Sequence, residues 1–284
     1  MANKPNIGAH VSAAGGLYNA FINAERIGAE CVQIFGGSPK MWRAKQPDEA
    51  VLKKYFEAQK LSKVGNVYLH ASYLVNLGSD KDANREQSVM SLIDHLAIAD
   101  KLKARGLIFH LGSSMSGTKE EAMKFTIAGM KSVLKAVPGE SWLIMENSAG
   151  GGHKLGREFS EVGDIIKAVG SPRVKVCLDT AHIFEAGGID EYSKPKVKKL
   201  FDDFDEHIGL DNLVALHIND SKTPFDSHND RHENIGAGHI GLDGFKNLAA
   251  DKRLHGKDWL LEVPGMDNMG PDKENMEIIR KLFR

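Results

Sequence analysis

Seven residues that can bind a metal ion lie at the ends of short apolar segments of the chain or directly after them. They are His70, His110, Glu146, Asp179, His182, His217 and Glu262. Asp230 and His232 lie in a polar segment, and their spacing of two residues turns both side chains to one side of an extended chain. Imidazole nitrogens and carboxylate oxygens, with no sulfur among them, suit Zn²⁺ and also accept Mn²⁺. Because one ion takes only three or four protein ligands, we expect about three zinc ions per chain, with Mn²⁺ acceptable at one or more sites.

This set is interpreted jointly, since each member alone has a simpler explanation. A single histidine or carboxylate at the end of an apolar segment is more often a surface residue or an ion-pair partner. Four carboxylates that converge on one place, however, repel one another strongly unless cations lie between them. The recurrence at segment after segment therefore predicts a metal centre.

Eight apolar segments recur along the chain and predict eight buried strands. They span residues 6–12, 31–37, 66–72, 106–112, 142–148, 174–182, 213–220 and 259–265. Their nearly continuous apolar composition is typical of strands buried on both faces, as in a parallel sheet. Segments 88–102, 120–137 and 158–170 carry apolar residues at spacings of three and four, which predict helices between the strands. Eight strand-then-helix units predict a (β/α)₈ TIM barrel.

The active site of such a barrel lies at the C-terminal ends of its strands, which is where the candidate ligands stand. We find no linker and expect one domain over residues 1–284. The polar, glycine-rich connection 220–241 is long for a compact fold, which indicates a functional loop. No G-x-G-x-x-G follows a strand, and this disfavours a dinucleotide-binding fold.

Composition restricts the location and the partners. We find no apolar run long enough to span a membrane and expect no signal peptide. Cys31 and Cys177 lie within apolar segments. Buried free thiols are favoured over a disulfide or metal ligands, which fits a cytoplasmic protein. The formal net charge of −1 does not by itself indicate a nucleic-acid-binding protein. No protein partner is evident, and we expect a monomer.

Five motifs together resemble bacterial endonuclease IV, the metal-dependent apurinic/apyrimidinic endonuclease. They are IGAHVSAAGG (7–16), YLHASYLVNLGS (68–79), LDTAH (178–182), HINDSK (217–222) and NDRHENIGAGHIG (229–241). The resemblance covers residues 7 to about 265 and implies a trinuclear zinc site. The first ion is implied on His70, His110 and Glu146, the second on Glu146, Asp179, His217 and Glu262, and the third on His182, Asp230 and His232.

The resemblance also implies the reaction. The expected substrate is double-stranded DNA, cut on the 5′ side of an abasic site to leave a 3′-hydroxyl and a 5′-deoxyribose phosphate. Removal of 3′-phosphates and other 3′-blocking groups is the expected side activity. Glu146 and Glu262 are the implied catalytic carboxylates, which hold and orient the metals that activate water. Three divalent cations would bring the formal charge of −1 to about +5, concentrated where the phosphate binds.

Candidate DNA contacts lie in the loops after the strands. The resemblance implies that Tyr73 and Leu74 penetrate the duplex, although the residues alone fit core positions equally well. Trp42 also matches, but Lys40 and Met41 stand before it where many members carry Arg and Gln, so the insertion mode of this loop stays open. Basic residues of the same loops are expected to contact phosphates, with solvated surface charge as the alternative: Lys40, Arg43, Lys222 and Arg231.

Other functions remain as alternatives. A metal-dependent sugar isomerase or epimerase on the same barrel would use Glu146, Asp179 and His217 with Glu262, but it needs no third metal. A catalytically inactive nucleic-acid- or metal-binding module does not require so many buried acids. A different phosphoesterase, acting on blocked 3′ ends or on RNA, could use the same ligands.

Overall fold

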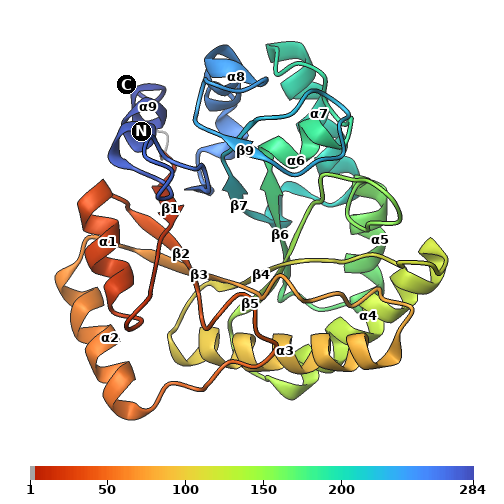
Figure 1. Ribbon diagram of the computed structural model, residues 1–284. Helices are drawn as coiled ribbons and strands as arrows, with labels where there is room; N and C mark the ends of the chain where they lie inside the picture. Colours follow the sequence, from red (N-terminus) through yellow and green to blue (C-terminus); the bar gives the residue numbers. More distant parts are fainter. Residues whose placement is uncertain (1–3) are drawn as a thin grey trace.

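A computed structural model describes residues 4–284, and eight parallel strands in it form a closed barrel (Figure 1). The order around the barrel is β1-β10-β7-β6-β5-β4-β3-β2. The strands are β1 (Ile7–His10), β2 (Cys31–Phe35), β3 (Asn66–His70), β4 (Gly106–His110), β5 (Trp142–Glu146), β6 (Val174–Asp179), β7 (Leu213–His217) and β10 (Asp258–Leu261). All eight predicted strands and the TIM barrel are thus confirmed.

Helices surround the strands on the outside of the barrel (Figure 1). They are α1 (Asn19–Ile27), α2 (Glu49–Leu61), α3 (Asp82–Lys101), α4 (Lys119–Ala136), α5 (Phe159–Val169), α6 (Thr180–Glu185), α7 (Lys194–His207), α8 (Gly241–Ala249) and α9 (Lys273–Lys281), with short 3₁₀ turns η1 (Leu210–Asn212) and η2 (Lys252–Leu254). The three predicted helices correspond to α3, α4 and α5. A local signal marks the start of α4, where the Thr118 side chain and Glu121 form a capping box.

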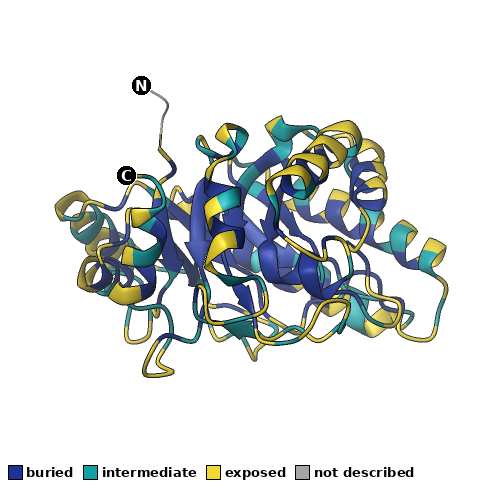
Figure 2. Cartoon of the chain, turned by 90° about the horizontal axis from the view of Figure 1, so that it is seen from above, coloured by how far each residue is buried: buried dark blue, intermediate teal, exposed yellow. Residues whose placement is uncertain are grey.

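The core has two parts. The larger part packs the outer faces of the strands against the helices, and the helix surfaces that face away from the barrel are exposed (Figure 2). The smaller part fills the barrel interior with one layer of side chains: Cys31, Tyr68, Ile108, Ile144, Cys177, Ala215 and Leu260. Both cysteines are buried free thiols, as predicted.

This interior layer explains where the polar residues point. Side chains alternate along a strand, so the residue two positions after an interior residue also faces inward, one layer nearer the mouth. His70 follows Tyr68 in this way, and His110 follows Ile108. Strand register then places neighbours side by side, because His110 pairs with Glu146, and Asp179 pairs with His217. The mouth is therefore lined by inward-facing polar side chains.

Three expected boundaries differ from the structure. Residues 180–182 begin α6 rather than ending β6, so His182 lies on a helix. Glu262 follows β10 directly instead of lying within it. The connection 220–241 contains a two-stranded antiparallel hairpin, β8 (Asp220–Ser221) with β9 (His232–Glu233). Among residues 4–284, no helix is both long and apolar enough to cross a membrane.

Candidate metal centre

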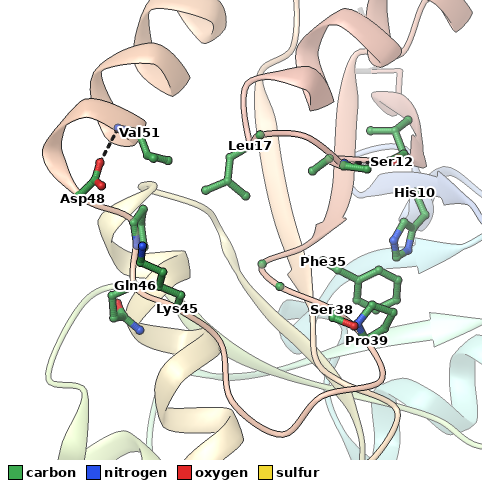
Figure 3. A pocket seen from close by; sticks show the side chains of 17 residues that line it. His10, Ser12, Leu17, Phe35, Ser38, Pro39, Lys45, Gln46, Asp48 and Val51 are labelled. Carbon is green, nitrogen blue, oxygen red and sulfur yellow. Dashed lines mark hydrogen bonds between the residues drawn. The ribbon is translucent and has the colours of Figure 1, made fainter.

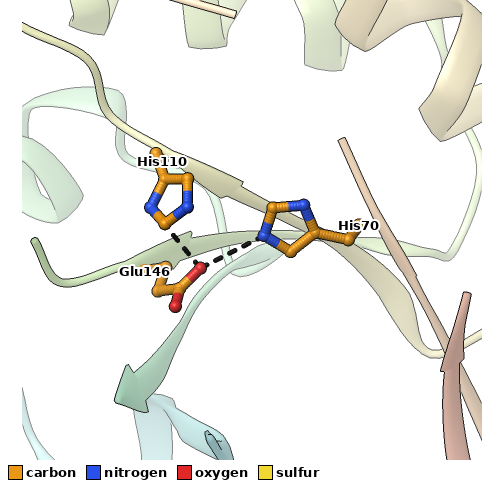
Figure 4. A group of neighbouring side chains, drawn as sticks. All are labelled: His70, His110 and Glu146. Atoms are coloured by element: carbon orange, nitrogen blue, oxygen red, sulfur yellow. Dashed lines mark hydrogen bonds and ion pairs between the residues drawn. The ribbon is translucent and has the colours of Figure 1, made fainter. Parts of the chain in front are cut away.

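Three neighbouring strands bring His70, His110 and Glu146 together at the mouth of the barrel. His70 Nε2 lies 3.2 Å, and His110 Nδ1 3.5 Å, from Glu146 Oε2. Figure 4 shows both imidazoles directed at this one carboxylate. Glu146 and His70 are almost completely buried, whereas His110 is 34% exposed. These donors form one candidate ligand group.

The other oxygen of Glu146 faces a second candidate group, which contains Asp179, His217 and Glu262. His217 Nδ1 lies 2.8 Å from Glu146 Oε1, 3.4 Å from Glu262 Oε2 and 3.8 Å from Asp179 Oδ2. Glu146 therefore stands between the first and second groups.

The third group combines His182 from α6 with His232 from β9, and Asp179 lies within reach of both. His182 Nε2 lies 3.3 Å from Asp230 Oδ2, and His232 Nε2 lies 3.5 Å from Asp230 Oδ1. His232 Nε2 is also 3.7 Å from Asp179 Oδ2. The structure thus adds Asp179 to the three residues expected here.

Hydrogen bonds orient three of the imidazoles. His70 donates its Nδ1–H to the carbonyl of the next residue at 2.8 Å, and His182 donates its Nδ1–H to the carbonyl of Asn147 at 2.9 Å. His217 instead donates its Nε2–H to Gln33 Oε1 at 2.8 Å. In each of these rings the other nitrogen faces a carboxylate oxygen, and histidine ligands commonly have such an outer hydrogen-bond partner on the nitrogen away from the metal.

The spacing of the donors fits shared cations. Tetrahedral coordination with bonds of about 2.1 Å separates two ligand atoms by about 3.4 Å. Most of the donor separations above lie between 3.2 and 3.8 Å, longer than an ordinary N–H···O bond of about 2.9 Å. The Nε2 atoms of His182 and His232 are buried and have no hydrogen-bond partner among the described residues. Buried nitrogens of this kind require a partner, and a metal ion would supply it.

Neighbouring groups of opposite charge shift the pKa values of Glu146 and His182 at the centre. Burial raises the pKa of Glu146, but the imidazoles of His110 and His217 outweigh burial and hold this pKa well below its usual range. Burial lowers the pKa of His182, yet Asp179 and Asp230 outweigh it and raise the pKa well above the usual value. Glu146 is therefore anionic, and positive charge beside it stabilises this form.

The candidates named from the sequence include neither Gln33 nor His10. Gln33 is fully buried, and its Nε2 donates to Glu262 Oε1 at 2.5 Å and lies 2.9 Å from His10 Nδ1. His10 Nδ1 is 3.1 Å from the same Glu262 oxygen. Both residues occupy the inward position at the mouth on β2 and β1. The sequence spacing could have identified Gln33. It stands two residues after the interior residue Cys31, just as the candidate ligands at the strand ends stand two residues after interior residues of their own strands.

The buried carboxylate of Asp220 holds the connection 220–241, which carries Asp230 and His232. Asp220 accepts backbone N–H groups of Gly236 and Ile240 at 2.9 Å each, and of Gly238 at 3.1 Å. A Cβ atom at Gly238 would lie 2.3 Å from the carbonyl oxygen of Ser221, so this close approach requires glycine. Sequence reasoning assigned no role to Asp220.

The predicted DNA contacts lie in loops around the same mouth. Tyr73 and Leu74 are 63% and 38% exposed, so the core alternative is wrong for them. With Trp42 they line a cavity of about 430 Å³ that also contains His110 and His182.

The basic residues divide into two kinds. Lys40, Lys222 and Arg231 are exposed, and none of them forms an ion pair with a residue in the described range. The Lys222 backbone N–H donates to the Arg231 carbonyl at 2.9 Å, which places the two residues side by side. Arg43 is different, because its guanidinium binds Asp94 on α3 at 2.5 and 3.1 Å.

Two further cavities extend the mouth. One of about 550 Å³ is lined by residues of the metal centre, including His70, His182 and Glu262. Another of about 650 Å³ shares His10 and Phe35 with it and lies between the loops that follow β1 and β2 (Figure 3). The cavities share lining residues and together extend across the mouth.

Comparison with known proteins identifies relatives along almost the whole chain. A protein-family model described as "Xylose isomerase-like TIM barrel" matches residues 21–282. A probable endonuclease 4 of Aquifex aeolicus is 34% identical, covering 98% of this chain and 97% of the relative. A probable endonuclease 4 of Campylobacter hominis is 36% identical, with 98% of each chain covered. The crystal structure of endonuclease IV from Thermus thermophilus has a TM-score of 0.86 at 32% identity, covering 98% of this chain and 99% of that chain.

More distant structures share the fold alone. A D-tagatose 3-epimerase-like protein has a TM-score of 0.72 at 18% identity, covering 98% of this chain and 97% of that chain. At this identity the likeness carries no argument about the reaction.

Proposed function

Because the chain belongs to the endonuclease IV family, we propose that this hydrolase of DNA phosphodiester bonds cuts duplex DNA 5′ to abasic sites. The products would be a 3′-hydroxyl and a 5′-deoxyribose phosphate, with removal of 3′-phosphates and other 3′-blocking groups as a side activity. The observation that carries the proposal is the convergence of nine metal-binding side chains beside the exposed pair Tyr73 and Leu74.

The donor sets fit about three zinc ions, with Mn²⁺ acceptable at one or more sites. We assign the first to His70, His110 and Glu146. The second is assigned to Glu146, Asp179, His217 and Glu262. The third belongs to His182, Asp230 and His232, with Asp179 facing the second and third groups. When bound, such ions neutralise the phosphate charge and make a water molecule nucleophilic at neutral pH.

The chain's own residues orient this chemistry. Glu146 and Glu262 are the proposed catalytic carboxylates, because Glu146 lies between the first and second ligand groups and Glu262 belongs to the second, so both would hold and orient the ions that activate water. Gln33 fixes the ring of His217 and the carboxylate of Glu262 at once. Phosphoryl transfer depends mainly on such positioning and on charge stabilisation.

Recognition of an abasic site depends on the absence of a base at that nucleotide. Tyr73 and Leu74 are exposed at the rim, and apolar side chains of this kind unstack and bend a duplex. A nucleotide without a base leaves the stack at low cost, since nothing pairs with it. Trp42 lines the same cavity, whereas Lys40, Lys222 and Arg231 are free to contact phosphates.

The remaining assignments follow from this role. We propose that residues 1–284 act as one domain, residues 1–3 lying outside the described range, and that the protein works in the cytoplasm as a monomer without an obligate protein partner. The sugar isomerase or epimerase alternative uses only the group of Glu146, Asp179, His217 and Glu262. It does not explain why His182 and His232 converge as a third group.

The test is cleavage of a labelled duplex that contains one tetrahydrofuran abasic analogue. Because the analogue cannot undergo β-elimination, a cut at this position must be hydrolytic. We expect a cut 5′ to the analogue that disappears after chelation and returns when Zn²⁺ or Mn²⁺ is added. A folded, metal-loaded protein that does not cut would overturn the proposal, and a panel of ketoses would then test the isomerase alternative.

A further inference from the structure

One buried glutamate outside the ligand set contacts the connection that carries two of the ligands. Glu185, the last residue of α6, is fully buried. Its Oε1 accepts the hydroxyl of Ser221 at 2.7 Å, the hydroxyl of Thr223 at 3.2 Å and the backbone N–H of Arg231 at 3.3 Å. Its backbone carbonyl also accepts the N–H of His228 at 2.9 Å. Glu185 therefore joins both ends of the segment 221–231.

The same helix carries a ligand of the third group. His182 precedes Glu185 by three residues, so both side chains lie on one face of α6. Arg231 stands directly between Asp230 and His232, whose side chains face His182 and Asp179. A single turn of helix thus provides one ligand and also holds the backbone between the other two.

Asp230 and His232 need this support more than the other ligands do. The remaining ligands lie at strand ends or on α6, where the barrel fixes the backbone. Asp230 and His232 come from a long connection, and the side chain of Asp230 is 45% exposed. Ordering a flexible backbone costs about 1–2 kcal/mol per residue, so a buried anchor at Arg231 directly favours the ligating geometry.

We infer that Glu185 is a positioning residue that holds Asp230 and His232 against His182, so that its loss weakens one metal position selectively. This inference rests on the three-metal function proposed above. Among the described residues, Glu146, His217 and Glu262 form no hydrogen bond with Glu185, so the ions beside them should be retained.

The experiment compares Glu185→Ala with Glu185→Gln, which retains the acceptor oxygen. Glu161→Ala is the matched control, because Glu161 is also a buried helix glutamate that accepts a loop N–H, from Gly156 at 2.9 Å, but contacts none of the ligands. Purified proteins are loaded with Zn²⁺, and bound metal is measured by inductively coupled plasma mass spectrometry during titration with a chelator. Thermal unfolding and steady-state kinetics on the abasic-analogue duplex complete the comparison.

We expect about three ions on the wild-type protein. In Glu185→Ala one of the ions should bind about 10–100-fold more weakly, as when outer partners of metal ligands are removed. Its kcat should fall while KM for the duplex changes little. Glu185→Gln and Glu161→Ala should retain all the ions with wild-type affinity.

Unchanged affinity for every ion in folded Glu185→Ala would overturn the inference, and so would equal loss of all ions. If that variant does not fold, the pair Ser221→Ala and Thr223→Val removes the hydroxyl donors while keeping the carboxylate. This pair should weaken the same ion several-fold, and unaltered binding would again contradict the inference. A wild-type protein that binds no metal would instead refute the proposed function.

Discussion

At the scale of single residues, the mouth of the barrel depends on side chains that are not themselves metal ligands. Gln33 is fully buried in the middle of β2 and contacts His217, Glu262 and His10. Gln33→Leu keeps the approximate volume but removes all three polar contacts. We expect kcat/KM on the abasic-analogue duplex to fall about 10–100-fold, because loss of outer hydrogen-bond partners misorients metal ligands.

Steady-state kinetics and chelator titration measure this effect, and Gln87→Leu on the exposed surface of α3 serves as the control. Unaltered turnover and metal affinity in Gln33→Leu would show that the strands alone fix His217 and Glu262.

At the scale of elements, two loops form one unit at the rim. The N–H of Tyr73 and the hydroxyl of Ser72 donate to the carbonyl of Pro39 at 3.1 and 2.8 Å, which joins the loops after β2 and β3. Tyr73→Ala with Leu74→Ala removes the exposed apolar pair. Since stacking of a base on an aromatic side chain contributes about 1–3 kcal/mol, binding to the abasic duplex should weaken about 10–100-fold.

Fluorescence anisotropy with a labelled duplex measures the binding, and metal content should stay at the wild-type level. Ile22→Ala with Leu61→Ala removes two exposed apolar residues from outer helices and should leave binding intact. A double variant of Tyr73 and Leu74 that binds as tightly as wild type would eliminate the wedge role.

At the scale of the whole molecule, the net charge of −1 does not attract DNA, so the attraction must come from positive charge gathered on one part of the surface. Bound metal and the exposed cations beside it supply a positive field at one end of the barrel. DNA affinity should therefore decrease with salt, and Lys222→Ala or Arg231→Ala should each reduce the slope of log affinity against log salt by about one.

Binding isotherms at several salt concentrations give this slope. Lys60→Ala, an exposed charge at the end of α2, is the control and should not alter the slope. A slope that Lys222→Ala and Arg231→Ala both leave unchanged would mean that neither side chain contacts a phosphate.

The sequence by itself determined the barrel and the types of ligand. Buried parallel strands are continuous apolar segments, and a polar residue that ends such a segment must face the mouth or the helices, so these residues could be named from the chain alone. The exposed positions of Tyr73 and Leu74 could not, because a loop after a strand has no periodicity that separates core from rim.

Only the tertiary structure showed that Asp179 lies beside two of the candidate ligand groups and which residues hold these groups in place. Asp179 faces two groups because β6 and β7 pair Asp179 with His217 while the hairpin places His232 opposite. Gln33 was missed because it lies inside a segment already explained as a strand, and Glu185 because it lies in a helix, α6, that the sequence did not predict. Their roles come from contacts with residues far away in the chain, and those contacts exist only after strand register and barrel closure bring the residues together.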